Sequence, residues 1–438
     1  MIDDTTLQRA AESLAPAPDG LSATYALETV GDPIEIAREL AGEASSGTFV
    51  KTPGQNQDLE AKHGARVIDV RIVGDVPQSG LPSRQLAPDS DVRHAVARIW
   101  WPPANTASLS ACLTAAAGNI TELASLTGIR LLDITLPRGL LDELPRPPLG
   151  ISGTRRLVGA TGRPLLGTII KPSVGLDPET TAAMAATVAE AGLDFIKDDE
   201  LLCNPPYNRI VDRVRAVEAA LDRCEARTGH RPIFAYNVTA DTATEMIGRA
   251  DTVMRLGGRC VMVNLNIVGL SAVLDLRKNT DLPIHGHRAG WGLLGRSSLL
   301  GMAFEAYQTL WRAVGIDHLH VSGLRSKFWE SDAVVLRSIA ATLRPLRAGT
   351  DDRVLPVLSS GQTAQHIPHT AHALGHCDFL LLAGGAIWAH PGGPASGVRS
   401  LAQAWEAYET GERLEDFAAH HPELAAALTA FPSRERSR

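Results

Sequence analysis

The sequence predicts an α/β fold whose C-terminal part is a closed (β/α)8 barrel, and three observations support this. Short apolar segments recur after residue 160, stretches with helical spacing lie between them, and polar or ionisable residues follow most of the apolar segments. Near-continuous apolar strands that alternate with helices are typical of a parallel sheet covered on both faces. Eight such units favour a closed barrel, with a doubly wound open sheet as the alternative.

The individual elements follow from the periodicity of the apolar residues. Strands are expected at residues 23–30, 66–73, 165–171, 193–197, 233–238, 260–265, 282–287, 317–322, 355–360 and 378–383. Helices are expected, among others, at residues 34–45, 106–120, 179–192, 209–229, 243–257, 298–315 and 333–349. The proline- and glycine-rich segment 144–153 indicates a linker or a domain entry. A chain of 438 residues exceeds one ordinary core, so we expect a first domain over 1–142 and the barrel over 143–438.

The bulk composition argues against several classes of protein. Hydrophobic residues make up 44% and charged residues 21% of the chain, as in soluble globular proteins. The net charge of −7 argues against nucleic-acid and acidic-membrane partners. The sequence has no apolar run long enough to span a membrane, and its acidic N-terminus is unlike a secretory signal. The five scattered cysteines form no C-x-x-C pair, which favours the reducing cytoplasm.

The segment AGLDFIKDDE, residues 191–200, places one cation and three anions at the end of an apolar strand. Alternate side chains of a strand share a face, so Lys197 and Asp199 point the same way, and Glu200 can join them if the chain turns. One interpretation is a lysine neutralised by its neighbours. The other is a desolvated lysine whose lowered pKa leaves a neutral amine. Such an amine can add CO2, and the carbamate, Asp199 and Glu200 would then offer three oxygens to Mg2+.

This segment resembles the metal-site motif of the large subunit of ribulose-1,5-bisphosphate carboxylase (RuBisCO), in which the lysine is carbamylated. Further segments resemble the same family in the same order along most of the chain. They place its site residues on Glu43 and Thr48 (42–49), Asn119 (116–120), Lys171 (167–172), His287 and Arg288 (285–290), His320 and Lys327 (317–330), Ser359 and Gly361 (355–361), and Gly384 and Gly385 (383–393).

The resemblance implies a role for each of these residues. The metal ligands would be Lys197, Asp199 and Glu200, with Mg2+ and a lysine carbamate as cofactors. Catalysis would use Lys171, Lys197, His287 and Lys327. Substrate and phosphate contacts would come from Arg288, His320, Ser359, Gly361, Gly384, Gly385, Glu43, Thr48 and Asn119. The roles of Asn237 and Asn264, at two other strand ends, stay open.

The resemblance also implies an architecture and an assembly. The first domain would be a ferredoxin-like α+β domain. The protein would form a homodimer with shared active sites, because the N-terminal domain of one subunit completes the barrel mouth of its partner in this family.

Departures from the carboxylase pattern indicate a RuBisCO-like protein and not a CO2-fixing enzyme. Ile169 and Ser173 replace a threonine and a second lysine near the reacting carbon, Phe49 replaces a tryptophan, and Ser326 replaces a glycine before the loop lysine. The first functional hypothesis is decarboxylation of 3-oxo-isoapionate 4-phosphate through an enediolate, or transfer of its carboxyl group followed by hydrolysis. The alternatives are an enolase or isomerase acting on a methylthio-pentulose phosphate, and a non-catalytic binding protein.

Overall fold

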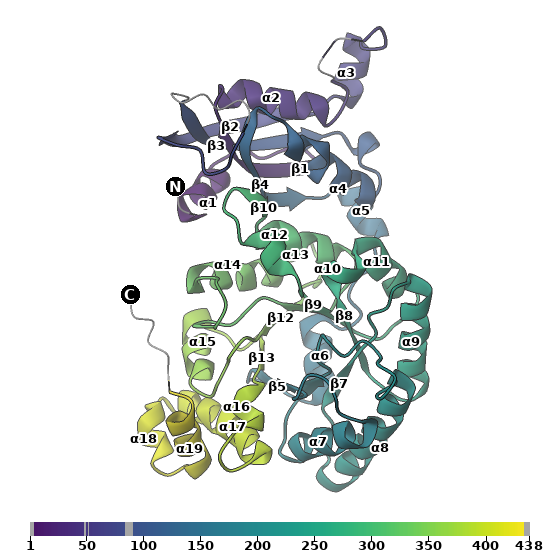
Figure 1. The fold of residues 1–438 in the computed structure, drawn as a ribbon, viewed down its shortest axis with the longest axis vertical. Coiled ribbons are helices and arrows are strands. Elements are labelled where there is room, and N and C mark those ends of the chain that lie inside the picture. Colours follow the sequence, from purple (N-terminus) through teal and green to yellow (C-terminus); the bar gives the residue numbers. More distant parts are fainter. Residues whose placement is uncertain (1–3, 48–49, 51, 84–90, 433–438) are drawn as a thin grey trace. The chain divides into compact units, whose positions relative to one another are not determined.

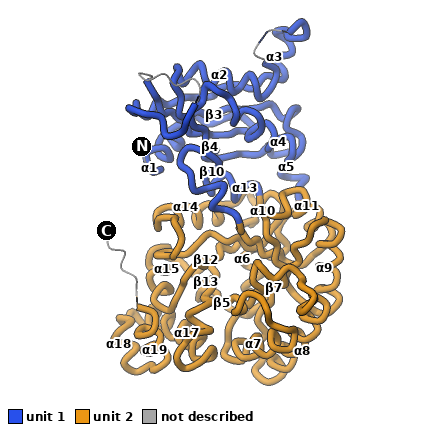
Figure 2. Tube along the Cα trace, viewed as in Figure 1, with its two compact units in different colours: residues 1–144, 290–310 blue, residues 145–289, 311–438 orange. Residues whose placement is uncertain are grey.

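The computed structural model describes residues 4–47, 50, 52–83 and 91–432. The chain divides into two compact units, each described by itself below (Figure 2). Unit 1 contains residues 1–144 and 290–310, and unit 2 contains residues 145–289 and 311–438. Among the described residues, no helix is both long and apolar enough to cross a membrane.

Unit 1 is built on a mixed sheet with the strand order β10-β4-β1-β3-β2 (Figure 1). Its strands are β1 (Leu21–Thr29), β2 (Arg66–Val76), β3 (Val92–Trp101), β4 (Leu126–Thr135) and β10 (Leu300–Met302). β10 runs parallel to β4, whereas the other pairs are antiparallel. Every residue of the central strand β1 is buried. This is the α+β N-terminal domain that the resemblance implied.

Unit 1 also contains several helices. They are α1 (Asp4–Glu12), α2 (Pro33–Glu43), α3 (Gln57–His63), α4 (Leu109–Ala117), α5 (Arg138–Glu143) and α12 (Trp291–Gly295). Of these, α1, α2 and α12 contact the strands of the sheet. Leu7 and Ala11 of α1 pack with Val96 and Leu132 of the sheet in one apolar cluster. Asp32 caps α2 by accepting a hydrogen bond from the backbone of Ile34, and a proline at the first helical position favours the same start.

The prediction of a helix over residues 298–315 is wrong for the first residues of this segment. Residues 300–302 form β10, and the helix α13 (Phe304–Ala313) begins only after them. Gly301 has a φ of +79°, and a Cβ there would lie 1.8 Å from the carbonyl oxygen of Leu294. The close approach of two backbones at this glycine therefore overrides the local helical pattern.

Unit 2 is a closed barrel of parallel strands, which excludes the open-sheet alternative (Figure 1). In chain order the strands are β5 (Leu165–Ile169), β6 (Phe195–Lys197), β7 (Ile233–Asn237), β8 (Cys260–Asn264), β9 (Ile284–His287), β11 (His318–His320), β12 (Leu355–Leu358) and β13 (Leu380–Leu382). Each lies within a segment expected to be a strand. β13 pairs with β5 and so closes the ring.

Helices follow the barrel strands, and those over residues 178–190, 210–228, 243–255 and 332–343 match segments expected to be helical, whereas those over 270–278, 366–374 and 394–410 were not among the segments named. The principal ones are α7 (Pro178–Glu190), α8 (Ile210–Thr228), α9 (Ala243–Arg255), α11 (Leu270–Lys278), α14 (Asp332–Leu343), α15 (His366–Leu374) and α17 (Pro394–Thr410). Short helices α10 (Leu265–Val268) and α16 (Gly385–Trp388) follow β8 and β13, and α18 (Leu414–Ala418) and α19 (Pro422–Ala430) follow α17.

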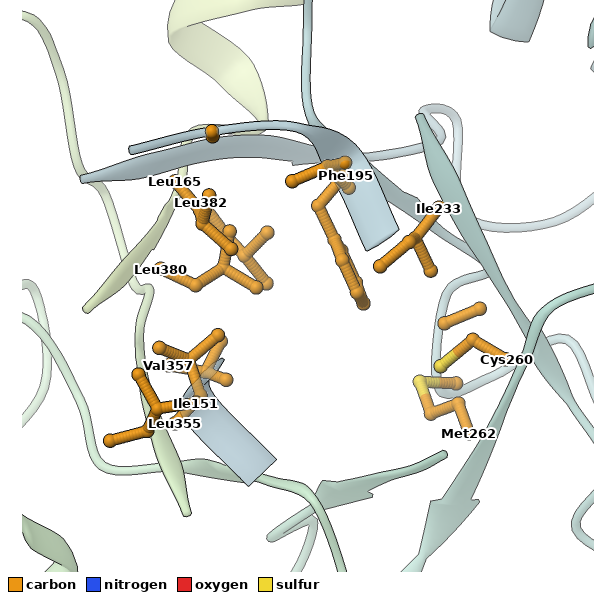
Figure 3. Close-up of a cluster of buried hydrophobic side chains, with 13 residues drawn as sticks. Ile151, Leu165, Phe195, Ile233, Cys260, Met262, Leu355, Val357, Leu380 and Leu382 are labelled. Atoms are coloured by element: carbon orange, nitrogen blue, oxygen red, sulfur yellow. The ribbon is translucent and has the colours of Figure 1, made fainter. Parts of the chain in front are cut away.

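The interior of the barrel holds apolar side chains from strands and from one helix (Figure 3). Phe195, Met262 and Leu382 belong to this cluster, together with Ile151 and Val158 of α6 (Gly150–Val158). α6 precedes β5 and packs against the residues at the starts of the strands. The interior is therefore a packed core, and in barrels of this kind ligands bind at the carboxyl ends of the strands.

Candidate active site

The polar residues at the carboxyl ends of the barrel strands begin with Lys197, the last residue of β6. Its side chain is only 1% exposed. The Nζ atom donates to the carbonyl oxygen of Asp198 over 2.8 Å and lies 3.4 Å from Oε2 of Glu200. It also lies 3.5 Å from Sδ of Met262, in the apolar core. Burial lowers the pKa of Lys197 despite the opposite influence of Glu200 and Asp199, which favours the neutral amine.

Two of the three acids that follow Lys197 pair with other cations, and only Glu200 keeps an ion pair with it, at 3.4 Å. Asp198 faces outward, where its Oδ2 lies 3.0 Å from Arg213 of α8 and accepts a hydrogen bond from the backbone of Asn237. Lys171 donates to Oδ2 of Asp199 over 2.6 Å. The interpretation of Lys197 as a lysine simply neutralised by its neighbours therefore has little support in this arrangement.

Glu200 and His287 lie close to each other, beside Lys197. Nε2 of His287 is 3.5 Å from Oε2 of Glu200. Burial alone would raise the pKa of Glu200, but Lys197, His287 and Lys171 and a backbone N–H outweigh it and lower that pKa. A neutral Lys197 and a neutral His287 would contribute less to this shift, yet Lys171 and the backbone N–H still favour the carboxylate. We therefore treat Glu200 as ionised.

Two asparagines hold the backbone of the acidic segment, and they answer the open question about Asn237 and Asn264. The side-chain amide of Asn237 lies 3.3 Å from the carbonyl oxygens of both Asp199 and Glu200. That of Asn264 donates to the carbonyl oxygen of Glu200 over 2.8 Å. Both asparagines end apolar strands, which is the signal that pointed to them. Oδ1 of Asn264 is buried and has no partner among the described residues.

Four histidines, two on β9 and two on β11, lie in the interior of the barrel. His285 pairs in register with His318, and the rings of His287 and His320 lie 4.4 Å apart. Burial lowers the pKa of each of these histidines, so all four are neutral near pH 7. Nδ1 of His320 is 3.2 Å from Oγ of Ser359, which follows β12.

Lys327 lies in the segment between β11 and α14, over the end of β12. Its backbone N–H donates to the carbonyl oxygen of Ser360 over 3.2 Å. A Cβ added to Gly361 would lie 3.8 Å from the side chain of Lys327. Ser360 has a φ of +77°, a conformation that a residue with a side chain rarely adopts and that is often found at functional sites.

Arg288 and Glu330 form a bidentate ion pair that sequence reasoning did not foresee. Nη1 of Arg288 donates to Oε1 of Glu330 over 3.0 Å, and Nη2 donates to Oε2. The two side chains are 8% and 1% exposed. The guanidinium expected to hold a phosphate is therefore engaged by the same segment that carries Lys327.

Gly384 and Gly385 lie after β13, at the start of α16. A Cβ on Gly384 would be 3.8 Å from Cε of Lys171 and from Cδ1 of Ile169. The indole of Trp388 donates to the carbonyl oxygen of Ile169 over 2.7 Å, which ties α16 to the end of β5. The two glycines thus lie beside Lys171.

The remaining expected residues are not part of this set. Glu43 is the last residue of α2 and Asn119 the first residue of a short 3-10 helix (Asn119–Glu122), and both belong to unit 1. Thr48 lies outside the described residues. The expected site residues of unit 2 are the ones brought together.

Two carboxylates lie beside Lys197, where the expected magnesium ion would bind. The described residues contain no group of three or more His, Cys, Asp or Glu side chains that could hold a metal ion. Asp199 and Glu200 supply two carboxylates, and a carbamate on the buried amine of Lys197 would supply a third anionic group. The set therefore fits magnesium in the carbamylated form. Beside these residues, the buried Oδ1 of Asn264 has no hydrogen-bond partner among the described residues, so it could accept a hydrogen bond from a bound group.

Comparison with protein families gives two matches that together span both units. The model described as ribulose bisphosphate carboxylase large chain, catalytic domain, matches residues 150–431. The model for the N-terminal domain of the same chain matches residues 10–140.

Among curated proteins, an uncharacterized ribulose bisphosphate carboxylase-like protein of Bordetella bronchiseptica is 48% identical over 94% of this chain and 97% of its own length. A 3-oxo-isoapionate-4-phosphate transcarboxylase/hydrolase of Xanthobacter autotrophicus is 43% identical over 93% and 98%. A 3-oxo-isoapionate-4-phosphate decarboxylase of Rhizobium etli is 39% identical over 94% and 98%.

Two solved structures that match this chain belong to the same family. A rubisco-like protein from Burkholderia fungorum matches with a TM-score of 0.88 and 42% identity, over 94% of this chain and 100% of that one. A dimeric archaeal Rubisco from Hyperthermus butylicus matches with a TM-score of 0.80 and 27% identity, over 97% and 98%.

Proposed function

The chain belongs to the ribulose bisphosphate carboxylase large-chain family, as a RuBisCO-like enzyme, and on this premise we propose that it decarboxylates 3-oxo-isoapionate 4-phosphate or transfers and hydrolyses its carboxyl group. The relatives that carry these names align with almost the whole chain. The observation that carries the chemistry is the buried amine of Lys197 among Asp199 and Glu200, with Lys171 beside them.

The residues of this site would act on a 3-oxo acid in a definite order. Lys327 would hold the carboxylate over the end of β12 by charge attraction. When the bond between that carboxyl group and the adjacent carbon breaks, its electron pair stays on the substrate as an enediolate, and CO2 leaves. The Nζ of Lys171 would then deliver a proton to this carbon, and Asp199 and Ser173, at 2.6 and 2.8 Å, would hold the amine in place.

Magnesium is part of the proposal. Asp199, Glu200 and the carbamate of Lys197 would hold it, and when bound it would supply Lewis-acid stabilisation of the negative charge on the substrate oxygens. The substrate phosphate would be held by the backbone N–H groups of Gly384 and Gly385, together with Arg288 once Glu330 releases it.

CO2 fixation is not part of the proposal. Lys171 is the one lysine at the end of β5 because Ser173 stands where the carboxylase pattern has a second lysine, and the apolar Ile169 replaces a threonine. Both changes remove polar groups from the region in which a carboxylase must activate a second substrate.

The test is to follow the reaction of 3-oxo-isoapionate 4-phosphate by phosphorus and carbon NMR, with magnesium and bicarbonate present. Release of CO2 with one tetrulose phosphate would identify the decarboxylase, and two smaller acids would identify carboxyl transfer with hydrolysis. A substrate that stays unchanged, while a methylthio-pentulose phosphate is isomerised, would overturn the proposal in favour of the isomerase alternative.

A further inference from the structure

His285 is a fully buried residue of the barrel that has no part in the proposed reaction. It lies on β9, one step below the layer that contains His287 and His320, and it packs on the ring of Phe195. Its Nε2 atom is 2.8 Å from Nε2 of His320. Its Nδ1 atom has no hydrogen-bond partner among the described residues.

The contact between the two rings restricts their tautomers. Two imidazole nitrogens at hydrogen-bonding distance need one proton between them, and either ring can supply it. Both rings are buried and neutral, so each carries a single N–H. If His285 donates, His320 must carry its proton on Nδ1. If His320 donates, His285 must carry its proton on Nδ1.

The unpartnered Nδ1 of His285 decides between these arrangements. In the second arrangement it would be a buried N–H with no acceptor, whereas in the first it is only a bare lone pair. Orphaned buried N–H groups are rarer than under-satisfied acceptors. The first arrangement, with His285 as donor, is therefore favoured.

His318, the in-register neighbour of His285, shows the same preference independently. The hydroxyl of Thr154 donates to the carbonyl oxygen of Gly150 over 2.6 Å, so Oγ1 can only accept from His318. Nε2 of His318 lies 2.8 Å from this oxygen and must carry the proton. Its Nδ1 is bare, as in His285. The barrel interior thus already contains one histidine with a proton on Nε2 and an unpartnered Nδ1.

We propose that His285 is a positioning residue that, by donating its Nε2–H to His320, fixes His320 with its proton on Nδ1 and makes Ser359 a hydrogen-bond donor to the substrate. Nδ1 of His320 is 3.2 Å from Oγ of Ser359. When this nitrogen donates, the hydroxyl hydrogen of Ser359 is free to turn to the barrel mouth. With the opposite tautomer, His320 would consume that hydrogen.

The ligand of this donor is an oxygen with negative charge, either on the carboxylate or on the developing enediolate of the sugar acid. This part of the inference rests on the proposed function. The tautomers of the resting protein do not, so the two can fail separately.

The first experiment uses full-length protein labelled with 15N histidine and no substrate. Long-range 1H–15N correlation distinguishes the two tautomers of each ring, and the H320Q variant identifies the signals of His320. We expect a proton on Nδ1 of His320 and on Nε2 of His285 and His318. A proton on Nε2 of His320 would overturn the proposal.

The second experiment compares variants of His285. In H285Q the amide can still donate to His320, whereas H285L cannot. We expect H285L to lower kcat/KM by about ten- to a hundredfold, the effect of losing a hydrogen bond to a charged group, and H285Q to restore most of it. In an S359A background H285L should cause little further loss, because the two residues act in series.

H318L is the matched control, since it removes a neighbouring buried histidine that does not contact His320. It should leave the 15N pattern of His320 unchanged. Equal losses in H285L, H285Q and H318L, or an undiminished effect of H285L in S359A, would show that His285 has only a packing role.

Discussion

For the single residue Lys197, the neighbouring sequence and the folded surroundings predict opposite charge states of the amine. Read locally, three acids follow the lysine and should neutralise it. In the folded chain Asp198 pairs with Arg213 and Asp199 with Lys171, while Glu200 stays 3.4 Å away. The amine is left with burial as its strongest influence, and burial favours the neutral form that reacts with CO2.

Replacing Lys197 by methionine should stabilise the protein while abolishing its activity. Methionine fills a similar volume without a buried charge, so we expect the free energy of unfolding at pH 7 to rise by about 1–3 kcal/mol. The pKa of Lys197 is lower in the folded than in the unfolded chain, so between these two values the unfolded chain binds more protons. Wild-type stability should therefore rise with pH through this window, and the advantage of K197M should shrink.

The measurement is urea unfolding of both proteins at pH 7 and at pH 9.5. K197R is the control, because it retains a cation that cannot be deprotonated in this range. It should be destabilised at both pH values. A K197M variant that is less stable than wild type at pH 7 would contradict a neutralised, desolvated amine.

The segment between β11 and α14 is the element in which structure adds most to the sequence pattern. Its backbone is fixed at Lys327 by the carbonyl oxygen of Ser360, and at Arg325 by Asp332, whose Oδ1 accepts a hydrogen bond over 2.7 Å. Glu330 adds the buried ion pair with Arg288. The segment that carries Lys327 therefore also pairs, through Glu330, with the guanidinium of Arg288, which is expected to hold the phosphate. Substrate phosphate and Glu330 would compete for Arg288.

Replacing Glu330 by glutamine should loosen this segment. The change leaves the buried guanidinium without its counter-charge, and breaking a buried pair is costly, so we expect a loss of about 2–4 kcal/mol in local or global stability. Trypsin should cleave after Arg325 and Lys327 faster than in the wild type, and the KM for the phosphorylated substrate should change more than kcat.

E415Q is the control for this prediction, because Glu415 and Arg413 form a pair at 3.8 Å with both side chains largely exposed. It should change neither cleavage nor KM. Unchanged proteolysis in E330Q would show that the ion pair does not hold the segment.

At the scale of the whole molecule, the expected site residues fall into two sets. Lys171, Lys197 and the residues around them belong to unit 2, whereas Glu43 and Asn119 belong to unit 1. We propose that the second set completes the site of another subunit in a homodimer. One structure that this chain resembles, an archaeal Rubisco from Hyperthermus butylicus, is dimeric.

Mixing two inactive variants tests the shared site. N119A and K197M should each be inactive alone. If a site takes residues from both subunits, unfolding and refolding them together should restore activity in half of the sites of the mixed dimers, about a quarter of the wild-type value. K171M mixed with K197M is the control. Both changes lie in unit 2, so each site of a mixed dimer contains one of them, and no activity should be restored. No activity in either mixture would contradict the shared site.

The sequence by itself determined the family, the barrel and the positions of its eight strands, because apolar periodicity and strand-end chemistry are local properties of the chain. It also pointed to Lys171, Lys197, Asp199, Glu200 and the histidines that the fold brings together in unit 2. Strand β10 was missed because its conformation depends on the close approach of Gly301 to Leu294.

Only the tertiary structure decided which partner each charged or polar group takes. The pairs Asp198–Arg213, Asp199–Lys171 and Arg288–Glu330 join residues on different elements. So does the contact of His285 with His320. Hydrogen bonds and ion pairs act over a few ångströms in space, whereas sequence patterns report only neighbours along the chain. The choice between the two interpretations of Lys197 depends on such contacts, and so does the proposed position of the proton on His320.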